Sequence, residues 1–177
     1  MAEIKRSFAV ITGVNQYKNG IPPLETAVND ASELAKILEK EYEYKVLQLL
    51  DADATKSKLN DLLTAFGQQQ LPLADGLIQM LESDRLLFDF GGHGIALDGL
   101  DNADGPTGYV VPQDARRDDS NTWVAMQRLH DALIQLPCRH LLIILDCCFA
   151  GAFRWAELQR EAVRSPYQKT PISRYTC

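Results

Sequence analysis

Two apolar segments of the chain end in side chains that could do covalent chemistry. Residues 85–90 lead into the tetrapeptide GGHG, which contains His93, and residues 141–145 lead into DCC, which contains Cys147 and Cys148. A histidine beside a cysteine can activate the thiol as a nucleophile, and such pairs serve peptide-bond chemistry more often than any other. The residues therefore indicate cysteine-based hydrolysis, provided that the fold brings the two segment ends together.

Of the two adjacent thiols, Cys148 is the better candidate for the nucleophile. Side chains alternate along a strand, so Asp146 and Cys148 share one side while Cys147 points to the other. Unpaired cysteine is among the most buried residue types, and Cys147 is therefore predicted to be a core thiol.

The two segments resemble the catalytic motifs of the caspase-like cysteine peptidases. The metacaspase and orthocaspase branch carries Asp-x-Cys-His-Ser-Gly, and this chain has DCCFAG at 146–151. The likeness extends from about Phe8 to Phe153. It departs at Phe149 and Ala150, which replace His and Ser, and at Gly91, where Ser or Ala is more usual before Gly-His-Gly.

The resemblance implies a cysteine endopeptidase that works through a Cys148 thioester, with His93 as the acid and base. It further implies that the backbone amides of Gly94 and Cys148 would stabilise the oxyanion, and that Asp146 lines a pocket for an Arg or Lys preceding the cleaved bond. Asp30 stands where the same families often place a second pocket acid. An alternative for Asp30 is a helix N-terminal acid that interacts with the macrodipole.

The elements that must position these residues alternate between strand and helix. Apolar runs predict strands at 7–14, 45–50, 85–90 and 141–145, and helical spacing predicts helices at 27–42, from the cap Thr55 to about 70, and at 125–136. Apolar strands alternating with helices predict a parallel sheet covered on both faces, a three-layer α/β/α sandwich. Residues 71–83 are expected to be a loop leading into a short helix, and 95–122 a long polar loop.

In an open parallel sheet, ligands bind beyond the carboxyl ends of the strands. His93 follows the third predicted strand and Cys148 the fourth, so both fall at that edge. We expect residues 1–155 to form the catalytic, large-subunit domain and residues 156–177 a polar tail.

A rival hypothesis is a catalytically incomplete interaction module or pseudoenzyme. Caspase-like folds usually continue past the nucleophile with further strands, the small subunit, whereas only about 26 residues follow Gly151 here. If the fourth strand lies at the sheet edge, its unpaired backbone groups favour association. The expected partners are therefore a protein or peptide substrate and either a C-terminal small-subunit segment or a second copy.

Charge and cysteine usage exclude several classes of protein. The net charge is −6 with a pI near 5.0, and no run of Lys or Arg predicts nucleic-acid binding. No apolar run is long enough to span a membrane, and a cytoplasmic protein with reduced thiols is expected.

No metal or cofactor is expected either. Cys138 and His140 begin the strand that Cys147 and Cys148 end, roughly 23 Å away, so the two groups cannot share a metal. Calcium activation, known in some metacaspases, would involve the acidic loop, but its spacing does not fit an EF-hand. Its acids are Asp98, Asp101, Asp104, Asp114, Asp118 and Asp119.

Overall fold

The structure is a computed structural model that describes residues 3–97 and 107–148. Its centre is a parallel sheet of four strands in the order β2-β1-β5-β9. The strands are β1 (Arg6–Gly13), β2 (Lys45–Leu50), β5 (Asp84–Gly91) and β9 (His140–Asp146). All four were predicted from their apolar runs, and their parallel pairing confirms the α/β class.

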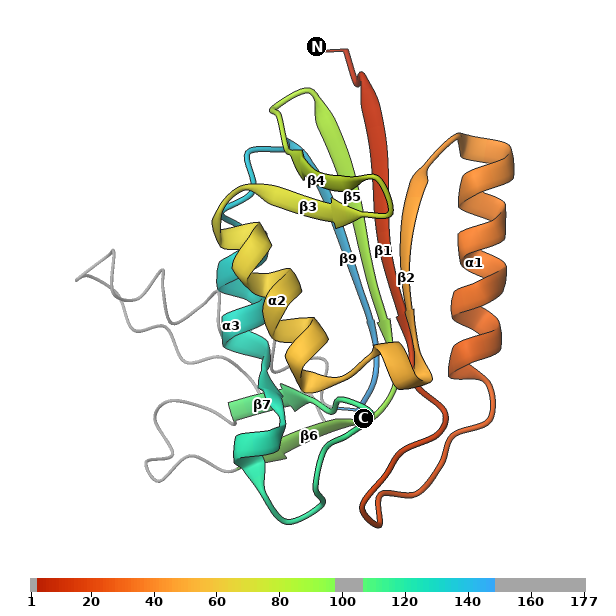
Figure 1. The fold of residues 1–177 in the computed structure, drawn as a ribbon, viewed down its shortest axis with the longest axis vertical. Coiled ribbons are helices and arrows are strands. Elements are labelled where there is room, and N and C mark those ends of the chain that lie inside the picture. Colours follow the sequence, from red (N-terminus) through yellow and green to blue (C-terminus); the bar gives the residue numbers. More distant parts are fainter. Residues whose placement is uncertain (1–2, 98–106, 149–177) are drawn as a thin grey trace, which may run out of the picture.

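Helices cover both faces of this sheet (Figure 1). Helix α1 (Ala27–Tyr42) packs on one face over a small cluster that includes Ala9, Ile11 and Leu87. Helices α2 (Lys56–Gly67) and α3 (Met126–Leu133) pack on the other face over the larger cluster, which includes Phe8, Phe66 and Phe88. The predicted three-layer sandwich is therefore confirmed.

Local signals explain where the helices begin and how closely they pack. The Thr55 hydroxyl accepts a hydrogen bond from Lys58 N at 3.3 Å, so it caps α2 as predicted. At Gly13 an added Cβ would lie 2.6 Å from the Ala27 carbonyl oxygen and 2.8 Å from the Ala31 Cβ. Glycine thus lets α1 start directly against the end of β1, close to the sheet edge that carries the reactive residues.

The chain order places a topological switch point at that edge, between β1 and β5. From β1 the chain crosses through α1 to β2 on one side, and it then returns through α2 to β5 on the other side of β1. The connections that follow β1 and β5 therefore lead to opposite sides of the sheet. Such a reversal is a topological switch point, and open α/β sheets bind ligands there, beyond the carboxyl ends of the strands.

Two predictions of irregular structure were wrong. Where a loop and a short helix were expected at 71–83, the chain forms a hairpin of β3 (Gln70–Leu73) and β4 (Gly76–Gln79). A short 3₁₀ turn, η1 (Asp51–Asp53), lies between β2 and α2. Ala74 and Asp75 form the two-residue loop of the hairpin, and Gly76, the first residue of β4, has a φ of 115°, which glycine adopts without strain.

The predicted long loop after residue 94 also contains regular structure. Strands β6 (Gly94–Leu97), β7 (Thr107–Val110) and β8 (Val124–Ala125) form a small antiparallel sheet, and η2 (Ser120–Thr122) lies before β8. Helix α3 is shorter than the predicted 125–136. Val110 and Val124 belong to the larger core cluster. Tertiary packing therefore stabilises these short strands, which the polar sequence around them did not predict.

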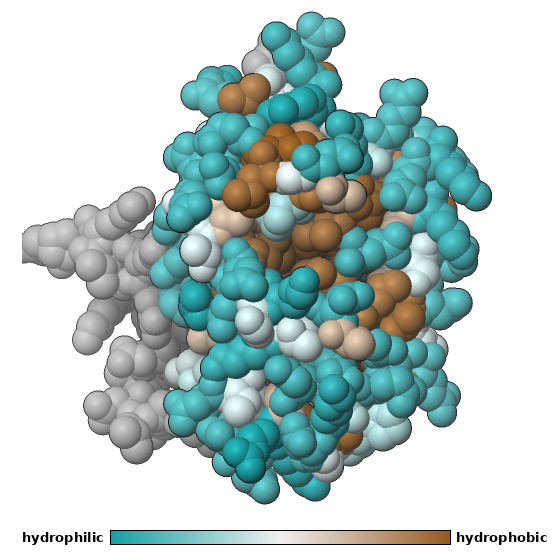
Figure 2. Space-filling model, viewed as in Figure 1, coloured by the Kyte–Doolittle hydropathy of each residue, from teal (hydrophilic) through white to brown (hydrophobic). Residues whose placement is uncertain are grey.

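Apolar side chains remain exposed in two regions. On the face shown in Figure 2 they gather around the β3–β4 hairpin and the sheet beside it, where Leu77 and Leu81 are exposed. On β9, Leu142 and Ile144 are 54% and 38% exposed. Within the described residues, β9 pairs only with β5 and is an edge strand.

Candidate active site

The structure brings the ends of β5 and β9 together. Gly91 pairs with Asp146 in the sheet, and Gly92 N donates to the Asp146 carbonyl oxygen at 3.2 Å. A Cβ on Gly94 would collide with the Cys148 carbonyl and would lie 3.1 Å from the Cys147 Sγ. His93 is thus held between two glycines that both touch the cysteine segment, as the strand-end argument predicted.

The loop after β1 fixes the orientation of His93. Its Nε2 lies 2.9 Å from the Pro22 carbonyl oxygen, and its backbone amide donates to the Tyr17 hydroxyl at 2.6 Å. The Tyr17 ring also packs against the imidazole, with ring centroids 4.8 Å apart. Because a carbonyl only accepts, Nε2 carries the proton, and Nδ1 of the neutral ring is left as the base.

This loop is itself anchored at the end of β2. Asp51 Oδ1 accepts hydrogen bonds from the amides of Asn15 and Gln16 at 2.7 and 2.8 Å. Burial raises the pKa of Tyr17 well above its usual range, so the phenol stays protonated. Pro22, Tyr17 and Asp51 were not among the predicted site residues, and no motif in the sequence marks them.

The two cysteines differ in environment as predicted from strand alternation. Cys147 is partly buried against the larger core cluster, and burial, with smaller effects from Cys148 and Asp146, raises the pKa of its thiol to about 12. Cys148 is exposed. Cys147 is therefore a protonated thiol at neutral pH, and Cys148 is the thiol that faces solvent at this edge.

The amide of Gly94 is not used by the small antiparallel sheet. The His93 carbonyl accepts from Val111 N at 3.0 Å, which makes Gly94 and Val110 a non-hydrogen-bonded pair of the β6–β7 ladder. The Gly94 N–H consequently points away from β7.

Asp30 and Asp146 line the same cavity, which has a volume of about 400 Å³. A third carboxylate, Asp89, lines it as well and is only 8% exposed. Burial, followed by the nearby charge of Asp146, raises the pKa of Asp89 to about 6. Asp89 was missed, although an acid inside the apolar run LLFDF was a visible signal in a strand expected to be apolar throughout.

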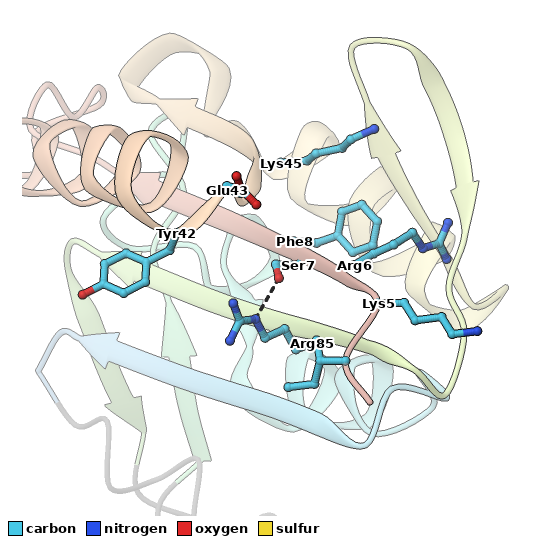
Figure 3. Close-up of a pocket in the computed structure, with 9 residues that line it drawn as sticks. Lys5, Arg6, Ser7, Phe8, Tyr42, Glu43, Lys45 and Arg85 are labelled. Atoms are coloured by element: carbon cyan, nitrogen blue, oxygen red, sulfur yellow. Dashed lines mark hydrogen bonds between the residues drawn. The ribbon is translucent and has the colours of Figure 1, made fainter. Parts of the chain in front are cut away.

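A larger hollow, of about 520 Å³, lies at the opposite end of the sheet (Figure 3). Lys5, Arg6, Lys45 and Arg85 line it, but Arg6 is paired with Asp84, and Arg85 donates to the Ser7 hydroxyl and stacks on Tyr44. Figure 3 shows that Arg85 turns toward Ser7 while Lys5 and Arg6 extend away from it. These cations do not converge on one point, and the hollow is far from His93.

In the described parts of the chain, no group of three or more His, Cys, Asp or Glu side chains is arranged to hold a metal ion. Of the acids of the suspected calcium loop, Asp114 accepts a hydrogen bond from Lys56 N at the start of α2, and Asp119 accepts one from Asn121 N in η2. Asp98, Asp101 and Asp104 lie outside the described residues, as do Phe149 and Ala150. No helix among the described residues is long and apolar enough to cross a membrane.

Comparisons with known proteins agree with the fold. A crystal structure of protein GSU0716 from Geobacter sulfurreducens is similar in fold, with a TM-score of 0.63 and 17% sequence identity over 94% of this chain and 68% of that one. No curated protein matches the chain significantly. The family model described as the caspase domain matches residues 6–173. The chain therefore belongs to the caspase-domain family of peptidases.

Proposed function

We propose that the protein is a cysteine endopeptidase that cleaves after Arg or Lys with Cys148 as nucleophile and His93 as acid and base. The observation that carries this proposal is the junction of the β5 and β9 ends, where Pro22 fixes the tautomer of His93 beside the cysteine segment. A domain of this family acts on proteins or peptides.

The chemistry follows from the groups at this junction. His93 Nδ1 accepts the proton of the Cys148 thiol, and the thiolate attacks the carbonyl carbon of the scissile bond. The Gly94 and Cys148 amides donate to the oxyanion that forms. The imidazolium then protonates the leaving amine, which leaves a thioester that a water molecule hydrolyses with His93 acting again as base.

Tyr17 and Pro22 support both proton transfers without touching the substrate. The Pro22 carbonyl accepts a hydrogen bond from the His93 Nε2–H and favours the imidazolium when it forms. The hydroxyl of the half-buried Tyr17 accepts a hydrogen bond from the His93 backbone amide. The ring is therefore oriented before substrate binds.

The proposed specificity rests on the cavity beside the nucleophile. Asp146 is two residues before Cys148 on the same side of the strand, about 6–7 Å away. A carboxylate at that distance can lie under the substrate side chain whose carbonyl meets the thiolate. Asp146 and Asp30 would pair a cation there and reject an acidic residue.

A second candidate function is an interaction module that needs a further segment for activity. It is favoured by the described edge of β9, where Leu142 and Ile144 are exposed beside unpaired backbone groups. A C-terminal segment or a second copy would extend the sheet there.

Alkylation of the purified chain by iodoacetamide near neutral pH distinguishes the two candidates. We expect fast labelling of Cys148 that is lost in His93→Ala, together with cleavage of fluorogenic Arg peptides that is lost in Cys148→Ala. Cys147→Ala is the matched control and should keep most activity. Slow labelling that does not depend on His93 would favour the interaction module, and activity in Cys148→Ala but not in a folded Cys147→Ala would reverse the assignment.

A further inference from the structure

Three carboxylates line the cavity beside the candidate nucleophile, and one of them lies deeper than the other two. Asp30 and Asp146 are exposed, whereas Asp89 is only 8% exposed. Asp89 pairs with Ile144 in the sheet, and Asp146 is two residues further along β9 on the same face. Strand geometry therefore places the Asp89 and Asp146 backbones roughly 8 Å apart, with Asp89 farther from the sheet edge.

In the part of the chain that the structure describes, Asp89 has no partner that would explain its burial. Among the described residues no hydrogen bond or ion pair reaches its carboxylate, whereas Asp84, buried on the same strand, accepts from Arg6 and from Leu81 N. A buried acid without a partner is costly, and native proteins rarely keep one without a reason.

The groups that face Asp89 do not compensate its charge. Asp146 on β9 and Asp30 on α1 are also acids, and the neighbouring residue on β1 is Ile11. Arg85, the nearest cation on the same strand and face, is four residues away, roughly 13 Å, and is bonded to Ser7. The cavity is therefore negative on every side that carries a titratable group.

The lining of the cavity suits a cation that has an apolar stem. Its walls also include Ala27, Ala31, Leu34, Ile144 and Leu145, which can pack against a methylene stem. Asp30, Asp89 and Asp146 are not close enough together to chelate one metal ion, since no three His, Cys, Asp or Glu side chains among the described residues are arranged to do so. Gly91 also lines the cavity, and because it has no side chain it adds no bulk there; an added Cβ would lie 3.6 Å from the Ala27 Cβ.

We propose that Asp89 is the floor of the specificity pocket and binds the charged end of a substrate arginine. The inference rests on the proposed function, because it assigns a further residue to the same pocket. Arg is favoured over Lys, since its longer side chain and planar fork can donate to Asp146 and Asp89 together.

Coupled proton loss predicts a characteristic pH dependence. Burial raises the pKa of Asp89 to about 6 in the empty protein, and an adjacent guanidinium would return it toward its ordinary range. Affinity for the cation should therefore rise with pH through about 6, and KM should fall. At pH 6 binding should release roughly half a proton per cation.

Two measurements test the proposal. Each is made on three proteins: the native protein, Asp89→Asn, and Asp61→Asn as a control for a charge removed far from the cavity. The first is KM for a fluorogenic Arg peptide from pH 5.5 to 8.5. At pH 7.5 we expect KM to rise at least about tenfold in Asp89→Asn, with its pH dependence near 6 lost and the preference for Arg over Lys reduced. Asp61→Asn should behave like the native protein, and Asp89→Ser is a second variant if Asp89→Asn does not fold.

The second measurement is calorimetric binding of N-acetyl-arginine methylamide at pH 6 in two buffers of different ionisation enthalpy. Proton release that occurs in the native protein and is absent from Asp89→Asn supports the proposal. If this release is seen but no peptide is cleaved, the proposed peptidase function is wrong while the binding role of Asp89 stands. Cleavage after Arg with unchanged KM in Asp89→Asn and no proton release overturns the role of Asp89 and leaves the function intact. Absence of both cleavage and binding overturns both.

Discussion

Neutralising Asp89 should stabilise the empty protein at neutral pH but much less in acid. Burial raises the pKa of Asp89 to about 6 in the folded chain, while an acid in the unfolded chain titrates near 3.9. The folded state therefore holds this proton more tightly, and ionising Asp89 costs stability as pH rises from about 4 to 6. Above pH 6 the full penalty is present, about 3 kcal/mol for two pKa units.

Urea unfolding of native protein and Asp89→Asn at pH 4.5 and 7.5 measures this penalty. Linkage gives a penalty of about 1 kcal/mol at pH 4.5 and about 3 kcal/mol at pH 7.5. The benefit of Asp89→Asn should thus be about 2 kcal/mol larger at the higher pH. Any constant cost of burying the amide cancels in this difference. If Asp89→Asn changed the free energy of unfolding equally at both pH values, the conclusion that the Asp89 carboxylate is buried without a partner would be wrong.

Asp84→Asn is the matched comparison, and its effect at pH 7.5 should have the opposite sign. Asp84 lies on the same strand and is fully buried, but it accepts from Arg6 Nε and Nη2 at 2.8 and 2.6 Å and from Leu81 N at 2.7 Å. Its removal should cost about 1–3 kcal/mol. If both substitutions stabilised the protein, burial of an acid on β5 would explain the effect on stability, and the lack of a partner for Asp89 would not.

Three further predictions concern the site and the sheet edge. Gly94→Ala should lower kcat by at least about a hundredfold, because the added Cβ would collide with the Cys148 carbonyl. Circular dichroism checks that the variant is folded, and unchanged kinetics would argue against the close approach of Gly94 and Cys148. Tyr17→Phe leaves the His93 amide without its acceptor and should lower kcat about tenfold more than it changes KM, which steady-state kinetics would show. The double substitution Leu142→Lys with Ile144→Lys should reduce self-association in analytical ultracentrifugation, and a native chain that is already monomeric with high turnover would contradict the edge argument.

Most of the sheet and the helices could be predicted from the sequence because their signals are local. Apolar runs and helical spacing record which residues are buried, and these patterns gave the four parallel strands and α1 with its observed bounds. The β3–β4 hairpin and the β6–β7–β8 sheet were missed. Their strands are short and partly exposed, so packing against the core rather than periodicity stabilises them.

The candidate site divides in the same way. Strand alternation and order were enough to place Asp146 and Cys148 on one side, Cys147 on the side that packs against the core, and His93 at the same edge, because these are consequences of a period of two and of parallel pairing. Only the tertiary structure decided that the Pro22 carbonyl and the Tyr17 hydroxyl hold His93, and that Asp89 shares a cavity with Asp30 and Asp146. Those contacts join residues more than fifty positions apart through backbone groups and loop conformation, which leave no pattern in a single sequence.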